Sequence, residues 1–215
     1  GVVIDLHQQG EAFTITGSGF ADGIIGSSAN DVILAGNGND SIAGFAGVDV
    51  IRAQDGDDVI RAGTGDGNDF YDGGAGNNTV DYSATAGGVK VDLARVDHSA
   101  QSISGDPSTF AALMALGGYT DPTTAVALAV GAVTGVDVLV GIENVIGSSA
   151  ADVMLGDALG NVLNGFNGSD NIWGRGGNDV IIGGGGNDLQ VGGNGGASDA
   201  ASGNDKISGG AGRDK

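Results

Sequence analysis

Acidic residues recur along this sequence nine positions apart, and they are the side chains best placed to do chemistry. The recurring aspartates form two arrays: Asp22, Asp31, Asp40, Asp49, Asp58 and Asp69 in the first, and Asp152, Asp170, Asp179, Asp188, Asp205 and Asp214 in the second. Asn78, Glu143 and Asn161 hold the same place in the pattern, and extra residues within 64–68 and 194–202 lengthen two of the intervals. A fixed short period of this kind is typical of a fold built coil by coil.

The residue types in this pattern favour binding of a hard cation. Glycine-rich turns precede the acids, and their backbone carbonyls offer oxygen donors beside the carboxylates. Such oxygens suit Ca²⁺, whereas Mg²⁺ demands stricter octahedral geometry and keeps its waters. The chain has no Cys, and His7 and His98 are isolated, so nothing in the sequence favours zinc.

The spacing of the acids also makes a cation necessary. If two nonapeptides form one coil, acids two repeats apart stack at roughly 4.8 Å, the distance between neighbouring strands. Two carboxylates about 5 Å apart repel each other by about 3 kcal/mol at an effective dielectric near 20. Summed over the stacks, this repulsion rivals the stability of a domain, about 5–15 kcal/mol. We therefore expect several calcium ions, about eight if each stacked pair holds one, to offset the net charge of −19.

Short strands are the elements that must position these acids. An apolar residue follows two positions after nearly every acid, as Ile24 follows Asp22, with Gln190 as the exception. Because a strand points alternate side chains to opposite faces, one residue per strand faces inward. The pattern predicts an all-β fold, a parallel β-roll (a β-helix-like solenoid) in two blocks. Residues 1–80 form the first block with a preceding strand segment, 81–140 connect, and 141–215 form the second block.

The connecting segment lacks the nine-residue rhythm over about 102–135. Thr79–Ser83 and Val89–Leu93 are predicted to be two strands that close the first array. Asp-Pro pairs at 106–107 and 121–122 are helix-start signals, so Phe110–Leu116 and Thr124–Val130 are predicted to be two short helices. Helices this short need a partner surface, and we expect them to cover part of the second roll.

Composition excludes several classes of protein. The 27 acidic residues against 8 basic ones exclude a nucleic-acid partner, which requires a basic surface. No apolar run is long enough for a membrane span. The 45 glycines suggest disorder, but 40% of residues are hydrophobic, so we expect disorder only in the calcium-free state. No nucleophile–base pair lies outside the acid pattern, and we expect no enzyme activity.

The glycine-rich nonapeptides resemble the RTX family, the hemolysin-type calcium-binding repeats of secreted bacterial proteins, over about 13–80 and 141–215. The resemblance implies a parallel β-roll with Ca²⁺ in its turns, held by the aspartates named above. It also implies carbonyl ligands from turn glycines: Gly36, Gly38, Gly183, Gly185, Gly209 and Gly212. It further implies export by type I secretion machinery and folding outside the cell or at its surface. The chain would then be a calcium-binding piece of a larger protein, with that protein's flanking domains as its partners.

Some turns depart from the family pattern. Gly26–Asn30 and Gly147–Ala151 carry Ser and Ala where glycines belong, which predicts weaker or absent ion sites. Asn78 and Asn161 supply no charge. The two insertions fall within the pairs 49/69, 179/205 and 188/214, so those sites depend on whether the acids still stack.

Trp173 supports an alternative function. It follows the inward-facing Ile172 and should face outward, as should Val153, Leu155, Leu189 and Val191. An exposed apolar patch of this kind marks a contact surface. The alternative is an adhesin, surface-layer or polysaccharide-binding module, or a self-associating one, in which calcium is structural support.

Overall fold

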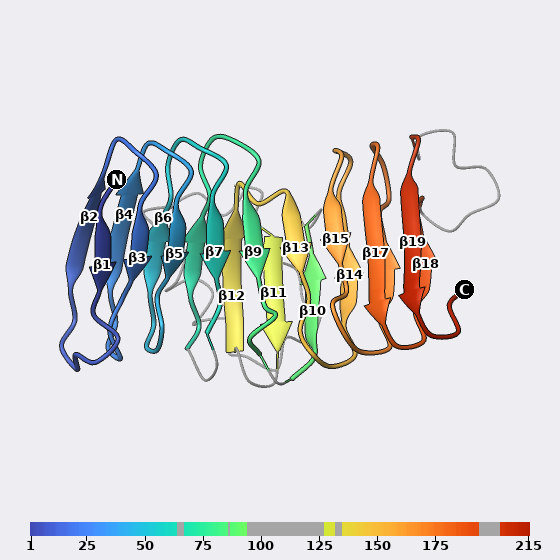
Figure 1. The fold of residues 1–215 in the computed structure, drawn as a ribbon, viewed down its shortest axis with the longest axis horizontal. Helices are drawn as coiled ribbons and strands as arrows, with labels where there is room; N and C mark the ends of the chain where they lie inside the picture. Colours follow the sequence, from blue (N-terminus) through green and yellow to red (C-terminus); the bar gives the residue numbers. More distant parts are fainter. Residues whose placement is uncertain (64–66, 86, 94–126, 132–134, 194–202) are drawn as a thin grey trace, which may run out of the picture.

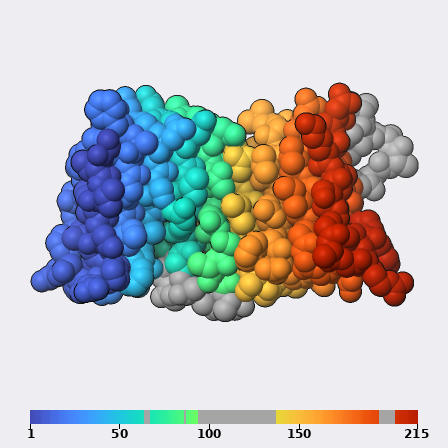
Figure 2. Space-filling view, viewed as in Figure 1, coloured from blue at the N-terminus to red at the C-terminus, as the bar shows by residue number. Residues whose placement is uncertain are grey.

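Two stacked β-sheets make one elongated solenoid, with the chain ends at its opposite ends (Figure 1). The structure is a computed structural model that describes residues 1–63, 67–85, 87–93, 127–131, 135–193 and 203–215. The N-terminal residues lie at one end of the long axis and the C-terminal residues at the other (Figure 2). All assigned elements in these ranges are strands, and the same ranges contain no helix able to cross a membrane.

Each coil contributes one strand to each sheet. In spatial order, the nine-stranded sheet contains β1 (Val3–Asp5), β3 (Gly23–Ile25), β5 (Ser41–Ala43), β7 (Val59–Arg61), β9 (Thr79–Asp81), β13 (Asn144–Ile146), β15 (Val162–Asn164), β17 (Val180–Gly185) and β19 (Lys206–Ala211). The ten-stranded sheet contains β2 (Thr14–Ser18), β4 (Val32–Gly36), β6 (Val50–Arg52), β8 (Phe70–Asp72), β12 (Gly135–Val140), β11 (Ala127–Gly131), β10 (Val89–Asp92), β14 (Val153–Leu155), β16 (Asn171–Trp173) and β18 (Leu189–Val191).

The core is a column of one inward residue per strand, as the sequence pattern predicts. Neighbouring strands pair in register, so that Ile24 lies beside Ile42, and Ile42 beside Ile60. The inward residues that are at most 1% exposed include Ile24, Ile33, Ile42, Ile51, Ile60, Tyr71, Val80, Val91, Leu139, Val145, Met154, Leu163, Ile172 and Ile181. Ile207, on the outermost strand β19, is instead 51% exposed. Each coil buries little apolar surface alone, so the core exists only when coils stack.

The two arrays form one continuous roll. In the nine-stranded sheet, β9 pairs directly with β13, which joins the end of the first array to the start of the second. In the ten-stranded sheet, β12, β11 and β10 lie between β8 and β14. Strand β11 is antiparallel to both of its neighbours, and the other described pairs are parallel. The roll therefore changes strand direction at a single place in the described chain.

The predicted helix over Thr124–Val130 is wrong where the structure describes it, because Ala127–Gly131 form β11. The physical reason is the pair of parallel strands on either side. Strands β10 and β12 would otherwise present unpaired backbone edges to each other, and β11 satisfies both. The predicted helix at Phe110–Leu116 lies outside the described residues.

The two predicted strands at 79–83 and 89–93 are confirmed as β9 and β10, but the role of β10 differs from the prediction. Strand β10 pairs with β14 in parallel, so that Val91 lies beside Met154. It therefore begins the second array within the ten-stranded sheet and does not close the first.

Candidate calcium sites

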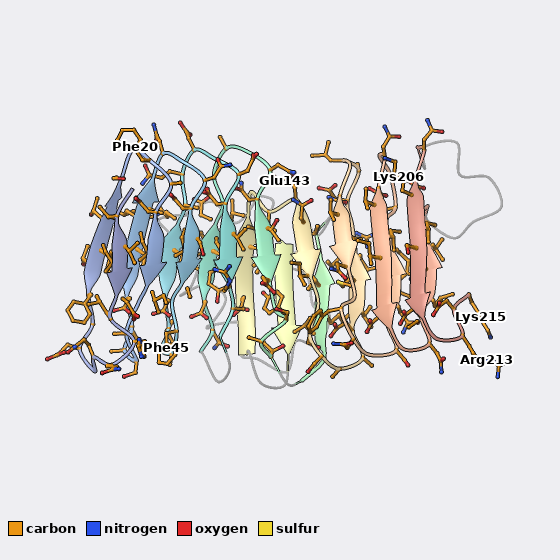
Figure 3. The ribbon with its side chains drawn as sticks, in the orientation of Figure 1. Phe20, Phe45, Glu143, Lys206, Arg213 and Lys215 are labelled. Atoms are coloured by element: carbon orange, nitrogen blue, oxygen red, sulfur yellow. The ribbon has the colours of Figure 1, made fainter. Side chains whose placement is uncertain are left out.

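The acids stack in two ladders that run along opposite edges of the roll; Figure 3 labels Glu143 on one edge and Arg213 on the other. The first ladder leads into the nine-stranded sheet and contains Asp22, Asp40, Asp58, Asn78, Glu143, Asn161, Asp179 and Asp205. The second leads into the ten-stranded sheet and contains Asp31, Asp49, Asp69, Asp137, Val89, Asp152, Asp170, Asp188 and Asp214. The stacking predicted within each array is confirmed.

One hydrogen bond repeats along both ladders. Within each array, the backbone N–H of an acid donates to Oδ1 of the residue in the same place on the following coil, as Asp22 does to Asp40 at 2.8 Å and Asp40 to Asp58 at 2.7 Å. These bonds fix one carboxylate oxygen of each acid, and they leave the second oxygen, Oδ2, to face the turn.

The ladders continue across both insertions. The N–H of Asp49 donates to Oδ1 of Asp69 at 2.8 Å, although the two acids are 20 residues apart. The corresponding distance is 3.0 Å from Asp179 to Asp205, and Asp188 donates to Asp214 at 3.2 Å. The extra residues therefore do not move these acids out of register.

Sequence reasoning missed Asp137, which the second ladder includes. Its side chain is fully buried, and its Oδ1 accepts the N–H of Asp69 at 3.2 Å. The sequence does contain the pattern of an acid followed two positions later by an apolar residue, because Leu139 follows Asp137 and faces the core. Asp137 precedes Glu143 by six residues rather than nine, so the nine-residue count passes over it.

In one class of turn, Oδ2 has no protein donor. Such an oxygen is buried without a hydrogen-bond partner, among the residues that the structure describes, in Asp40, Asp58, Asp170, Asp179 and Asp188. A buried carboxylate oxygen without a donor costs several kcal/mol in water-free surroundings. This arrangement is stable only if a cation or a proton supplies the missing partner.

The same oxygens face backbone carbonyls across a glycine. A Cβ built on Gly183 would lie 2.4 Å from Oδ2 of Asp188 and 2.5 Å from the carbonyl oxygen of Gly209, with Nε2 of Gln190 at 2.0 Å. A Cβ on Gly165 would lie 2.3 Å from Oδ2 of Asp170 and 2.5 Å from the carbonyl oxygen of Gly183. At Gly165 the nearest atoms are two oxygen acceptors and no donor, an arrangement that fits Ca²⁺.

The backbone conformation of these turns is left-handed at two positions, four and two residues before the acid. Gly36 and Gly38 have φ of 110° and 124°. Four other residues adopt positive φ at the first of these positions: Phe45 (84°), Gln54 (82°), Phe166 (68°) and Arg175 (71°). Because left-handed backbone costs a side chain about 1–2 kcal/mol, something in the turn must hold it there.

The predicted carbonyl ligands lie at different places in their turns. The carbonyls of Gly183 and Gly209 face Oδ2 atoms, as described above. The carbonyl of Gly185 accepts the N–H of Gly168 at 2.7 Å, and Gly212 has a φ of 150°. No group of three acidic or histidine side chains able to hold a metal occurs in the described ranges. An ion in these turns would therefore take most of its ligands from the backbone.

A second class of turn satisfies both carboxylate oxygens from the protein. The N–H of Ser27 donates to Oδ2 of Asp31 at 2.6 Å, and its hydroxyl donates to Oδ1 at 3.2 Å. Ser148 makes the same two bonds to Asp152, both at 2.7 Å. These are the turns in which the sequence has Ser and Ala in place of glycine.

Burial raises the pKa of five ladder acids in these turns. Burial, with a smaller contribution from neighbouring carboxylates, raises the pKa of Asp58 to about 6 and that of Asp170 to about 7. Burial also raises the pKa of Asp40, Asp152 and Asp179. Asp22 is the opposite case: burial opposes its charge, but hydrogen bonds from Val2 and Ser18 prevail and lower its pKa. The unpartnered carboxylates are thus costly to ionise without a cation.

Trp173 lies on the outer face of the ten-stranded sheet. It pairs in register with Leu155 on β14 and with Val191 on β18, and all three are half-buried. This agrees with the predicted apolar row. Its use as a contact surface stays a prediction.

The fold and the two ladders define a parallel β-roll whose turns offer oxygen ligands to a hard cation. The family model described as the RTX calcium-binding nonapeptide repeat (4 copies) matches residues 16–45, 25–60, 43–80, 164–196 and 199–215. These ranges cover more than half of the chain, which therefore belongs to this family. The family is a structural, calcium-binding one, typical of secreted bacterial proteins. A search of curated proteins found no match.

Proposed function

We propose that this chain is a calcium-dependent β-roll that becomes ordered outside the cell and stabilises a larger protein exported by type I secretion machinery. The observation that carries the proposal is the set of buried Oδ2 atoms without a donor, such as those of Asp170 and Asp188. Membership of a family typical of secreted proteins supports the location. The chain's role is then structural and not catalytic.

The ligands follow from the first class of turn. The acids that supply Oδ2 are Asp40, Asp58, Asp170, Asp179 and Asp188, with carbonyls such as those of Gly183 and Gly209 beside them. Asp205 and Asp214 repeat the geometry, since a Cβ on Gly192 or Gly209 would lie 2.1 Å or 2.4 Å from their Oδ2 atoms.

Other ladder acids do not require an ion. Asp22, Asp31 and Asp152 accept bonds from serines at Oδ2, and Asp69 accepts one from Tyr71. We therefore propose fewer ions than the about eight that one ion per stacked pair would give.

Binding and folding should be one process. In the unfolded chain the acids are far apart, so the ligand sets exist only when coils stack. In the folded chain the bound charge offsets carboxylate repulsion and gives each buried Oδ2 its partner.

A calcium titration tests the proposal. Protein treated with a chelator is titrated with Ca²⁺ or Mg²⁺ and followed by far-ultraviolet circular dichroism and calorimetry. We expect Ca²⁺ to produce β-structure with heat release, and Mg²⁺ at equal concentration to produce much less. Unchanged β-structure on adding Ca²⁺ would overturn the proposal.

A further inference from the structure

In the described part of the coils between the two arrays, no acid has the unpartnered Oδ2 of the first class of turn. We call the junction the segments 69–85 and 137–161, which contain β8, β9, β13, β14 and the C-terminal part of β12. In the second ladder, the hydroxyl of Tyr71 donates to Oδ2 of Asp69 at 2.9 Å, and that of Tyr82 donates to Oδ2 of Asp137 at 2.9 Å. The two tyrosine hydroxyls thus supply the partner that a cation would otherwise give to these carboxylate oxygens.

In the first ladder, two asparagines hold acid positions and donate to the backbone carbonyls that face them. Asn78 holds an acid position, and its Nδ2 donates to the carbonyl oxygen of Gly141 at 3.0 Å. Asn161 also holds an acid position, and its Nδ2 donates to the carbonyl oxygen of Glu143 at 2.9 Å. An amide has no charge to neutralise and brings its own donor. The carbonyls that face these positions are therefore satisfied by the protein.

The junction also holds the largest buried side chains. Tyr71, Tyr82 and Phe70 are each at most 1% exposed, and Tyr71 occupies the inward position that isoleucine has on β6. Larger inward side chains bury more apolar area per coil. The junction therefore combines the largest fully buried side chains with two acids, Asp69 and Asp137, whose Oδ2 atoms the protein itself satisfies.

We propose that the junction stays folded without calcium and divides the calcium-dependent coils into two arms that become ordered on either side of it. The arms are residues 36–60 and 165–190, which contain the acids with unpartnered Oδ2. This inference rests on the proposed function, because the arms are defined by calcium dependence. A folded junction gives each arm a template of paired strands on which its first coil can stack.

Hydrogen–deuterium exchange of the full chain, read by mass spectrometry with chelator and with Ca²⁺, tests the inference. With chelator, we expect peptides from 69–82 and 137–155 to be protected while those from both arms exchange freely. On adding Ca²⁺, the arms should gain protection. If the junction exchanges as fast as the arms with chelator and all gain protection with Ca²⁺, the inference is wrong and the proposed function stands. If no segment gains protection with Ca²⁺, the proposed function fails.

Two variants separate the tyrosine hydroxyl from general packing. Tyr82→Phe removes the donor to Asp137 and should speed exchange of the junction, with chelator present, by about tenfold or more, as loss of a hydrogen bond to a charged group implies. Ile51→Val removes one methylene at the matching inward position of an arm and should leave junction exchange with chelator unchanged. Equal junction exchange in Tyr82→Phe and the parent protein would show that the hydroxyl does not replace an ion.

Discussion

Asp152 and Asp170 occupy neighbouring coils of the second ladder and share one role. The Oδ1 of Asp152 accepts the N–H of Val89 at 2.7 Å, and that of Asp170 accepts the N–H of Asp152 at 2.8 Å. They differ at Oδ2, which Ser148 satisfies in Asp152 and which has no donor in Asp170. The role of each acid therefore depends on the turn before it, four residues away.

This difference makes a matched pair of variants. Asp170→Asn keeps the Oδ1 acceptor but removes the charge, so calcium affinity should fall by at least the about tenfold seen when an outer partner of a metal is removed. Asp152→Asn should lower stability through the lost Ser148 bond and leave the calcium affinity close to that of the parent. Calorimetric titration measures the calcium affinity of both variants. Equal losses of affinity would contradict the assignment of the Asp170 Oδ2, and not that of Asp152, as a calcium ligand.

The sequence could predict where the acids stack but not the state of each one. The nine-residue period places Asp170 and Asp152 correctly, and Ser148 in place of glycine marks a different turn. Phe166 and Arg175 carry no such mark, yet both adopt the left-handed backbone otherwise seen at glycine. Local preference opposes that conformation, so stacking with neighbouring coils must impose it.

At the scale of elements, β11 is the part that sequence reasoning predicted wrongly. Its small and aliphatic residues are good helix formers, and an Asp-Pro pair precedes them at 121–122. The strand forms because β10 and β12, distant in sequence, lie two strand positions apart and need a partner between them. Such a requirement is set by tertiary packing and leaves no trace in the local pattern.

Arg175 links β10 to the second array through an ion pair with Asp92, the last residue of β10. Its guanidinium contacts both carboxylate oxygens of Asp92, at 2.6 Å and 3.3 Å, and donates to the carbonyl of Gly156 at 2.8 Å. We expect Arg175→Ala to lower the free energy of unfolding of the calcium-loaded protein by about 1 kcal/mol, the upper end for a partly exposed ion pair. Arg175→Lys keeps the charge but loses the two-pronged contact with Asp92. Its free energy of unfolding should therefore lie between those of the parent protein and Arg175→Ala. Denaturant unfolding measures this, and an unchanged Arg175→Ala would show that the contact adds no stability.

At the scale of the whole molecule, the buried acids make folding depend on pH. Burial raises the pKa of Asp58 and Asp69 to about 6 and that of Asp170 to about 7, whereas an unfolded aspartate titrates near about 3.9. Between these values, the folded calcium-free roll binds more protons than the unfolded chain. Its stability therefore falls as pH rises through this window and recovers as pH falls.

We expect the chelated protein to gain β-structure as pH is lowered from about 8 to about 5, because protons then supply the partner that Oδ2 lacks. With calcium present, lowering the pH should instead disfavour folding, because protons compete with calcium for the same carboxylates. The calcium concentration needed for half-maximal folding should therefore rise as pH falls. Circular dichroism at several pH values, with and without chelator, checks both trends. Identical β-structure of the chelated protein at the two pH values would contradict the first.

The hydrogen bonds between ladder acids hold neighbouring coils in register even where extra residues separate them. Asp49 and Asp69, like Asp179 and Asp205, keep the same N–H to Oδ1 contact whether the intervening turn is short or long. Register is therefore set by the acids on each side and not by loop length. A foreign peptide, an epitope or a label inserted between two such acids should therefore leave the repeat on both sides unchanged.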